Sequence, residues 1–173
     1  ARARRARDRQ MAVVDRIDEI GPLFRLGELV RREIAGVPHD PVPGERLAEV
    51  VREAEPDTVR LAGPALGAVA LAASASMASG LPFIIVRGET KEYGTANRIE
   101  GPFERDDLVC LVEDVVTSGG ALAGSVSALR GAGLVVRNAL CVVDREEGGA
   151  DALARIAVRL WPLFRAVDIT DAT

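Results

Sequence analysis

Hydrophobic positions along this chain gather in short runs that alternate with amphipathic or small-residue stretches. Apolar runs of strand length lie at 58–63, 81–88, 107–114, 134–144 and 158–164. Helical spacing or small helix-forming residues fill the stretches 44–54, 64–80, 119–133 and 148–157. Between two of the strands, residues 89–101 are polar and rich in glycine, and we expect a long loop there.

The alternation of strand and helix predicts an α/β fold built on a parallel sheet. The expected strands are nearly continuous apolar runs, which is typical of strands that helices cover on both faces. Ligands in such folds bind beyond the carboxyl ends of the strands. Polar segments fall at three of these ends, namely Gly63–Gly67, Glu113–Gly120 and Asp144–Gly149.

Residues 1–43 do not show the alternation of strands and helices that begins at residue 44. The first ten residues are rich in arginine, and we interpret them as a solvated tail. Met11, Val14, Ile17 and Ile20 recur at helical spacing, whereas residues 23–36 fit either a second helix or a pair of strands. We therefore divide the chain into an accessory segment, residues 1–43, and a core domain, residues 44–173.

Composition narrows the class of protein. The chain has 173 residues, a hydrophobic fraction of 48% and a mean hydropathy of +0.13, which suits one compact domain. It has neither an apolar run of about 20 residues nor a signal peptide, so we expect a cytoplasmic protein and no membrane partner. The net charge of −4 gives no general attraction to nucleic acid. Cys110 and Cys141 lie in apolar runs and are interpreted as buried free thiols.

The richest chemistry lies at "EDVVTSGG", residues 113–120. Thr117 and Ser118 supply hydroxyls, and the two glycines that follow allow backbone N–H groups to converge on an anion at the start of a helix. Glu113 and Asp114 would repel a phosphate but would accept hydrogen bonds from sugar hydroxyls. A sugar phosphate therefore fits both halves, although an ordinary strand, turn and helix with capping hydroxyls remains the alternative.

The whole string is more specific than its parts. "CLVEDVVTSGGA" resembles the phosphoribosyl-pyrophosphate motif of type I phosphoribosyltransferases, and within that family it is most similar to the orotate branch. "GPALGAVALA", "PFIIVRGETKEYGTANRIEG" and "CVVDREEGGADAL" resemble further segments of that branch in the same order. The resemblance covers roughly residues 44 to 170.

The resemblance implies a fold and a reaction. The fold would be that of the type I phosphoribosyltransferases, with residues 1–43 holding a small hood. The reaction would transfer the phosphoribosyl group of phosphoribosyl pyrophosphate to orotate, giving orotidine 5′-monophosphate and pyrophosphate in the synthesis of UMP. It would require Mg²⁺, and the working unit would be a homodimer.

Roles for individual residues also follow from the resemblance. Glu113 and Asp114 would bind the ribose hydroxyls, and Asp114 is also assigned to catalysis. The turn for the 5′-phosphate would comprise Val116, Thr117, Ser118, Gly119, Gly120 and Ala121. The turn facing pyrophosphate would comprise Ala65, Leu66 and Gly67.

The catalytic loop and the base site complete these assignments. The loop of residues 88–100 would reach the neighbouring subunit's site. Arg87 and Lys91, the chain's single lysine, would neutralise the leaving pyrophosphate, and Tyr93 matches a position of His or Tyr in the family. Arg145 would bind the orotate carboxylate, since a guanidinium forms paired hydrogen bonds with a planar anion.

Two departures from the family pattern leave alternatives open. Gly88 stands where the family usually has a lysine, so one cation is missing. In the hood, only Phe24 and Leu26 resemble the usual segment. The alternatives are a phosphoribosyltransferase for another base and a non-catalytic sensor of phosphoribosyl pyrophosphate or a nucleotide that regulates transcription.

Overall fold

The computed structural model describes residues 43–88 and 98–171 of the chain. The helices are α3 (Pro43–Ala54), α4 (Val69–Ser79), α5 (Gly120–Gly131), α6 (Gly149–Ala154) and α7 (Ala166–Asp171). The strands are β1 (Arg60–Pro64), β2 (Phe83–Val86), β3 (Ile99–Glu100), β4 (Leu108–Val116), β5 (Val135–Asp144) and β6 (Arg159–Arg165). The expected helix at Met11–Ile20 and the ambiguous stretch 23–36 lie outside the described residues.

The strands form a six-stranded sheet in the order β3-β2-β1-β4-β5-β6. Every neighbouring pair is parallel except β2 and β3, which pair antiparallel through Ile85 with Glu100 and Val86 with Ile99. The α/β prediction is confirmed. The prediction of a loop through residue 101 was wrong at its end, because Ile99 is buried and completes the edge of the sheet. Helix α7 was not predicted.

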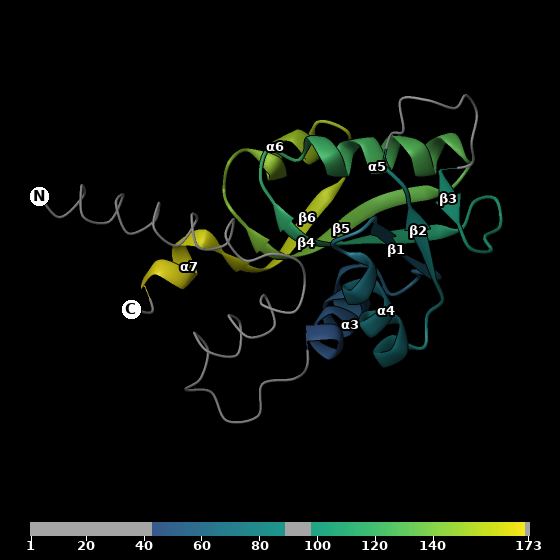
Figure 1. Ribbon diagram of the computed structural model, residues 1–173, viewed down its shortest axis with the longest axis horizontal. Helices are drawn as coiled ribbons and strands as arrows, with labels where there is room; N and C mark the ends of the chain where they lie inside the picture. Colours follow the sequence, from purple (N-terminus) through teal and green to yellow (C-terminus); the bar gives the residue numbers. More distant parts are fainter. Residues whose placement is uncertain (1–42, 89–97, 172–173) are drawn as a thin grey trace, which may run out of the picture.

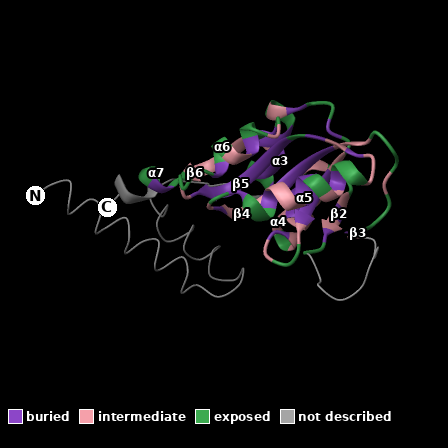
Figure 2. Ribbon diagram, turned by 90° about the horizontal axis from the view of Figure 1, so that it is seen from above, coloured by how far each residue is buried: buried purple, intermediate pink, exposed green. Residues whose placement is uncertain are grey.

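Helices cover both faces of the sheet (Figure 1). On one face, α3 and α4 bury Leu47, Val51 and Ala72 against β1, β4 and β5. On the other face, α5 and α6 contribute Leu122, Leu153 and their buried neighbours. The strands between these layers are largely buried (Figure 2), which explains why their sequences are almost uninterrupted apolar runs.

The direction of the chain changes between β1 and β4, the central pair of the sheet. The chain leaves β1 toward α4 on one face, whereas it leaves β4 toward α5 on the other. The loops at the carboxyl ends of these two strands therefore diverge and leave a crevice between them. In open α/β sheets such a switch point is where ligands bind.

Two further sequence expectations can be compared with the described residues. Both cysteines are buried and free, as expected, and burial raises the pKa of each thiol far above its ordinary value. Across residues 43–88 and 98–171, no helix combines the length and apolar character needed to cross a bilayer.

Candidate functional site

The two acidic residues lie near the carboxyl end of β4, beside the switch point. Glu113 and Asp114 belong to the strand, as the sequence pattern predicted, but the strand extends two residues further, to Val116. The backbone N–H of Asp114 donates to Glu113 Oε1 at 3.0 Å, and the N–H of Val115 donates to Asp114 Oδ1 at 2.8 Å. Both carboxyl groups are half-buried, and each keeps an oxygen that these bonds do not use.

The environment changes the acidity of Glu113. Burial, followed by the neighbouring carboxyl group of Asp114, raises the pKa of Glu113 to about 8. Near neutral pH this side chain therefore holds a proton, and the pair carries less negative charge than two separate carboxylates. A perturbed carboxyl at a strand end, next to a crevice, is a common property of functional sites.

The turn between β4 and α5 has the geometry expected of an anion-binding loop. Gly119 adopts a left-handed conformation with φ of 78°, which a residue with a side chain rarely adopts, and it serves as the N-cap of α5. No side chain caps this helix, so its first N–H groups remain available for a ligand. Within the described part of the chain, the Thr117 and Ser118 hydroxyls make no hydrogen bond either.

The sequence reading missed a residue that supports this turn. Gly149, the first residue of α6, packs directly against it, since a Cβ on Gly149 would collide with the side chain of Val116 and come within 2.5 Å of the Thr117 carbonyl oxygen. A Cβ on Gly119 would in turn lie 3.0 Å from the Gly149 backbone. Gly119 and Gly149 pack backbone against backbone and form a seam. The only sequence signal for it was the glycine pair at the start of α6, Gly148 and Gly149.

The turn after β1 meets the acidic pair, as the assignment of a joint site requires. An ideal Cβ on Gly67 would lie 2.7 Å from Asp114 Oδ2, so this turn passes directly beside that carboxylate. The N–H of Ala65 donates to the Val86 carbonyl at 2.8 Å, which ties this turn to the end of β2. Leu66 is 83% exposed at the outer side of the turn.

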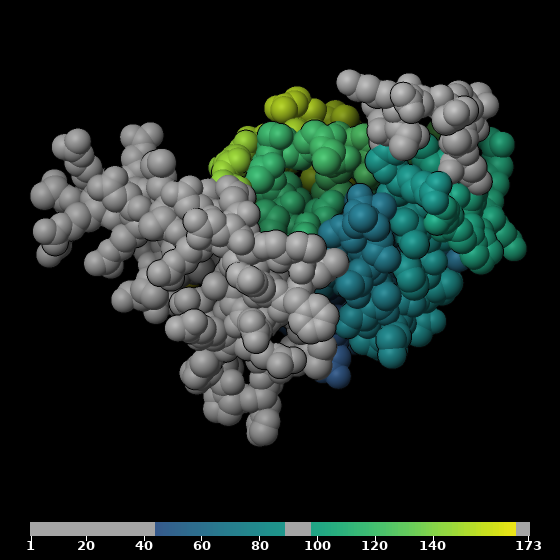
Figure 3. All heavy atoms as spheres, viewed as in Figure 1, coloured from purple at the N-terminus to yellow at the C-terminus, as the bar shows by residue number. Residues whose placement is uncertain are grey.

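A cavity of about 320 Å³ lies beside these segments. Its lining comprises Pro64, Ala65, Val86, Gly88, Arg98, Gly120, Ala121, Gly124 and Ser125. It therefore joins the turn after β1, the end of β2 and the first turns of α5. In the space-filling view, atoms of the β1–α4 region and of the β4–α5 region border each other on the same face (Figure 3).

Residues at the base of the expected catalytic loop are only partly described. Lys91 and Tyr93 lie outside the described residues. Arg87 is exposed, and its guanidinium pairs with Glu100 at 2.6 Å. The Arg87 N–H donates to the Arg98 carbonyl at 2.8 Å, and Arg98 Nε donates to the Arg87 carbonyl at 3.2 Å. These contacts make the two arginines neighbours at the start and end of the loop.

Arg145 reaches the same edge of the sheet from β5. Its backbone N–H donates to the Val116 carbonyl at 2.9 Å, so it begins next to the turn between β4 and α5. Its side chain is 12% exposed and pairs with Glu147 at 3.0 Å. Glu147 was not singled out from the sequence, and its spacing of two from Arg145 gave no separate signal.

Comparisons with known proteins agree on one family. No family model matches the chain. The chain is 44% identical over 133 residues to the orotate phosphoribosyltransferase of Halobacterium salinarum, covering 77% of this chain and 76% of that protein. The crystal structure of orotate phosphoribosyltransferase from Aeropyrum pernix superposes with a TM-score of 0.70 and 34% identity, covering 75% of this chain and 73% of that one.

A third relative was solved with a ligand. The orotate phosphoribosyltransferase of Mycobacterium tuberculosis H37Rv in complex with 5-phospho-alpha-D-ribosyl 1-diphosphate matches with a TM-score of 0.64 and 29% identity. The match covers 84% of this chain and 89% of that one. The resemblance inferred from the four sequence segments is confirmed, and the chain belongs to the orotate phosphoribosyltransferase family.

Proposed function

We propose that this protein transfers the phosphoribosyl group of phosphoribosyl pyrophosphate to orotate, with release of pyrophosphate, in the synthesis of UMP. The observation that carries the proposal is the meeting of Gly67 and Asp114 at the switch point, directly beside the uncapped start of α5. One ligand with hydroxyls, a phosphate group and a pyrophosphate group can span these three features. Membership in the family supports the same substrate.

The chemistry follows from the charged residues that the proposal assigns to this site. The bond between C1′ and the pyrophosphate oxygen breaks, a ring nitrogen of orotate bonds to C1′, and the proton of that nitrogen passes to the departing pyrophosphate or to water. The ribose becomes cation-like between these two events, so nearby negative charge stabilises it and positive charge stabilises the leaving group. Asp114 supplies the negative charge near the ribose, and Arg87 with Lys91 supplies the positive charge near the leaving group. The protonated Glu113 can donate to a ribose oxygen while Asp114 accepts.

The phosphate and the base occupy opposite sides of the ribose in this proposal. The 5′-phosphate binds the backbone N–H groups of residues 117–120, which need no cation because the helix start is itself electropositive. Arg145 binds the orotate carboxylate, and Glu147 holds the guanidinium in place. The hydrogen bond between the Arg145 N–H and the Val116 carbonyl keeps the two sites in a fixed relation.

The donor set near the ribose fits Mg²⁺. Within the described ranges no group of three or more His, Cys, Asp or Glu residues could hold a metal alone. Such a cluster is not required, because Mg²⁺ commonly binds through one or two carboxylates together with substrate phosphates and water. Asp114 would provide such a carboxylate, and the ion would neutralise charge on the pyrophosphate group. We further propose that the protein acts as a homodimer, in which the loop of residues 88–100 completes the neighbouring site.

An assay with defined substrates tests the proposed function. We expect the purified protein to consume orotate and release pyrophosphate in the presence of phosphoribosyl pyrophosphate and Mg²⁺, and Lys91→Ala to lower kcat by about 100-fold or more, because the charge on the leaving group is no longer balanced. Turnover of another base but not of orotate would keep the reaction class and change the substrate. Binding of phosphoribosyl pyrophosphate without turnover of any base would contradict the enzymatic proposal.

A further inference from the structure

The cavity beside the anion-binding turn contains a basic residue that the sequence reading did not assign. Among its nine lining residues, all of which belong to the described part of the chain, Arg98 is the only one with a charged side chain. The remaining lining is apolar or uncharged, and Gly120 and Ala121 bring the start of α5 to it. The cavity joins the turn after β1, which is assigned to pyrophosphate, to Arg98, and an arginine there can form paired hydrogen bonds with phosphate oxygens.

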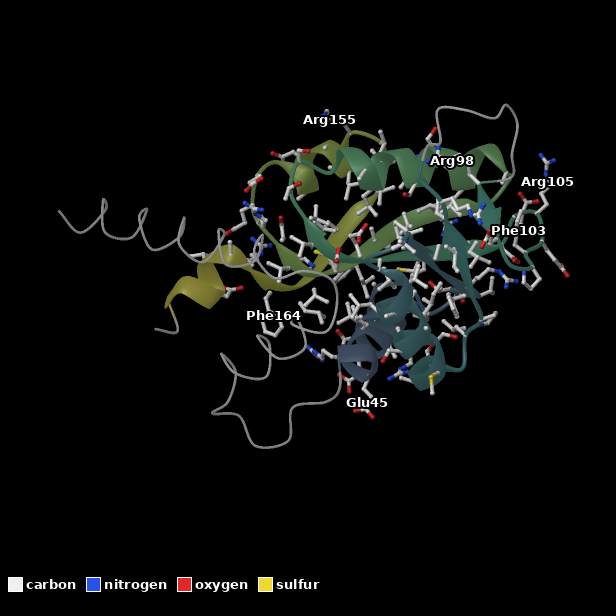
Figure 4. All side chains as sticks on the ribbon, in the orientation of Figure 1. Glu45, Arg98, Phe103, Arg105, Arg155 and Phe164 are labelled. Carbon is white, nitrogen blue, oxygen red and sulfur yellow. The ribbon has the colours of Figure 1, made fainter. Side chains whose placement is uncertain are left out.

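Hydrogen bonds between the residues that flank β2 and β3 fix the position of Arg98. Its carbonyl accepts from the Arg87 N–H at 2.8 Å, and its Nε donates back to the Arg87 carbonyl at 3.2 Å. These bonds hold Arg98 directly across from the end of β2, where Gly88 also lines the cavity. In Figure 4, Arg98 lies beside α5 at the end of the segment 89–97.

Arg87 alone is poorly placed to balance the charge of pyrophosphate. Its guanidinium forms an ion pair with Glu100 at 2.6 Å, and the side chain is 62% exposed. Gly88, the next residue, brings no charge into the cavity. A leaving group with several negative charges in this cavity would therefore need a second cation from the described residues that line it.

We propose that the Arg98 guanidinium binds the pyrophosphate group of the substrate and provides the cation that Gly88 cannot. This inference deepens the proposed function and rests on it. The planar fork of arginine can form two parallel hydrogen bonds with phosphate oxygens, so Arg98 would act on binding of the pyrophosphate group and not on recognition of the base.

The structure permits a direct rescue experiment. An ideal Cβ at Gly88 meets no atom of the described residues within 4 Å, and the backbone there has no positive φ, so a lysine at this position does not clash with that part of the chain. We would compare the wild type, Arg98→Met, and the double variant Arg98→Met with Gly88→Lys. Arg155→Met is the matched control, because Arg155 is exposed on the far end of α6, where it makes no side-chain bond within the described structure (Figure 4).

The readouts are calorimetric binding of inorganic pyrophosphate with Mg²⁺ and the KM values for both substrates. We expect Arg98→Met to weaken pyrophosphate binding and to raise the KM for phosphoribosyl pyrophosphate by about tenfold, as is typical when one charged hydrogen-bond pair is lost. The KM for orotate should change less than about twofold. The double variant should recover most of the lost affinity, and Arg155→Met should match the wild type.

Two results would overturn the proposal. One is unchanged pyrophosphate binding in Arg98→Met, and the other is a loss that Gly88→Lys fails to restore, which would mark Arg98 as a purely structural part of the β2–β3 base. If Arg98→Met unfolds, Arg98→Lys decides the question. It keeps the charge, so its pyrophosphate affinity should stay within about threefold of the wild type, and a larger loss would contradict the proposal. Pyrophosphate binding is measured without orotate, so failure of the wild type to use orotate would leave this result interpretable.

Discussion

Polar side chains are buried at both ends of the sheet, but they are satisfied in different ways. At the amino end, Asn138 donates to Glu55 Oε2 at 2.7 Å and accepts from Trp161 Nε1 at 2.8 Å, and Arg137 pairs with Glu55 at 3.1 Å. Side chains distant in sequence thus satisfy one another. At the carboxyl end, the acids of β4 instead accept from the backbone of the residues that follow them.

This difference separates a structural polar cluster from a candidate site. A closed network such as that of Glu55 and Asn138 has little capacity left for a ligand, and its value lies in stability. The pair Glu113 and Asp114 keeps unused oxygens beside a crevice, and the pKa of Glu113 is raised to about 8 by burial and by its neighbour. We therefore expect substitutions at the carboxyl end to affect activity and substitutions at the amino end to affect unfolding.

The largest effect is expected for Asp114→Asn. The change removes the negative charge that would face the cation-like ribose while keeping the size of the side chain, so kcat/KM should fall by about 100-fold or more. The assay is initial-rate kinetics with both substrates. Asp106→Asn is the matched control, because Asp106 is exposed in the turn before β4 with φ of 67°, which asparagine tolerates. Equal activities of the two variants would refute a role for Asp114.

Asn138→Ala tests the amino end. It leaves Glu55 and Trp161 without their buried partner, so the free energy of unfolding in urea should fall by about 2 kcal/mol. The activity per folded molecule should remain at the wild-type level. Arg137→Gln is the control, since its side chain is 65% exposed and its ion pair should contribute less than about 1 kcal/mol. A loss of activity per folded molecule in Asn138→Ala would contradict the claim that the amino end of the sheet affects stability and not activity.

Gly149→Ala tests the seam beneath the anion-binding turn. The added Cβ would press on Val116 and on the Thr117 carbonyl, so the KM for phosphoribosyl pyrophosphate should rise by about tenfold, which corresponds to about 1.4 kcal/mol. Gly131→Ala, at the end of α5, adds a Cβ into open space and should leave kinetics unchanged. If both variants show the wild-type KM, the turn does not depend on α6 for its shape.

The smallest effect concerns the pH dependence of stability. The folded state raises the pKa of Glu113 from its ordinary value of 4.5 to about 8, so the proton on this carboxyl favours the folded protein. That contribution is complete below about pH 4.5 and is lost as the pH rises through about 8. Glu113→Gln lacks this loss, so its stability relative to the wild type should increase steadily between pH 5 and pH 9.

Thermal unfolding of the ligand-free protein tests whether Glu113→Gln gains stability relative to the wild type as the pH rises. Thermal scans of Glu113→Gln and the wild type at several pH values give the difference directly. A difference that stays constant from acid to alkaline pH would show that Glu113 has an ordinary pKa, and it would remove the basis for assigning it a donor role toward the ribose.

The fold was largely predictable because its signals are local. Buried parallel strands require continuous apolar runs, and the runs around Leu111 and Leu140 gave β4 and β5 directly. The edge strand Ile99–Glu100 escaped prediction because two residues cannot show a period, and its identity depends on pairing with β2. Helix α7 lies beyond the matched segments and has no comparable apolar pattern.

A candidate site could be proposed from the sequence where one motif carries the chemistry. The acids and the turn of residues 113–120 are adjacent in sequence, so a joint role could be proposed without coordinates, and that role stays a prediction. Gly149 and Arg98 act from other segments, and only the folded structure brings them to the turn after β4 and to the cavity. The roles assigned to Lys91 and Tyr93 stay predictions, because these residues lie outside the described part of the chain.

A crystal structure of this protein with bound phosphoribosyl pyrophosphate and Mg²⁺ would test the arrangement most directly. We expect ribose hydroxyl oxygens within about 3 Å of the Glu113 and Asp114 carboxyl groups, and 5′-phosphate oxygens at the same distance from the N–H groups of residues 117–120. A ligand whose phosphate lies elsewhere, with both carboxyl groups turned away from the sugar, would contradict the assignment of this crevice as the substrate site.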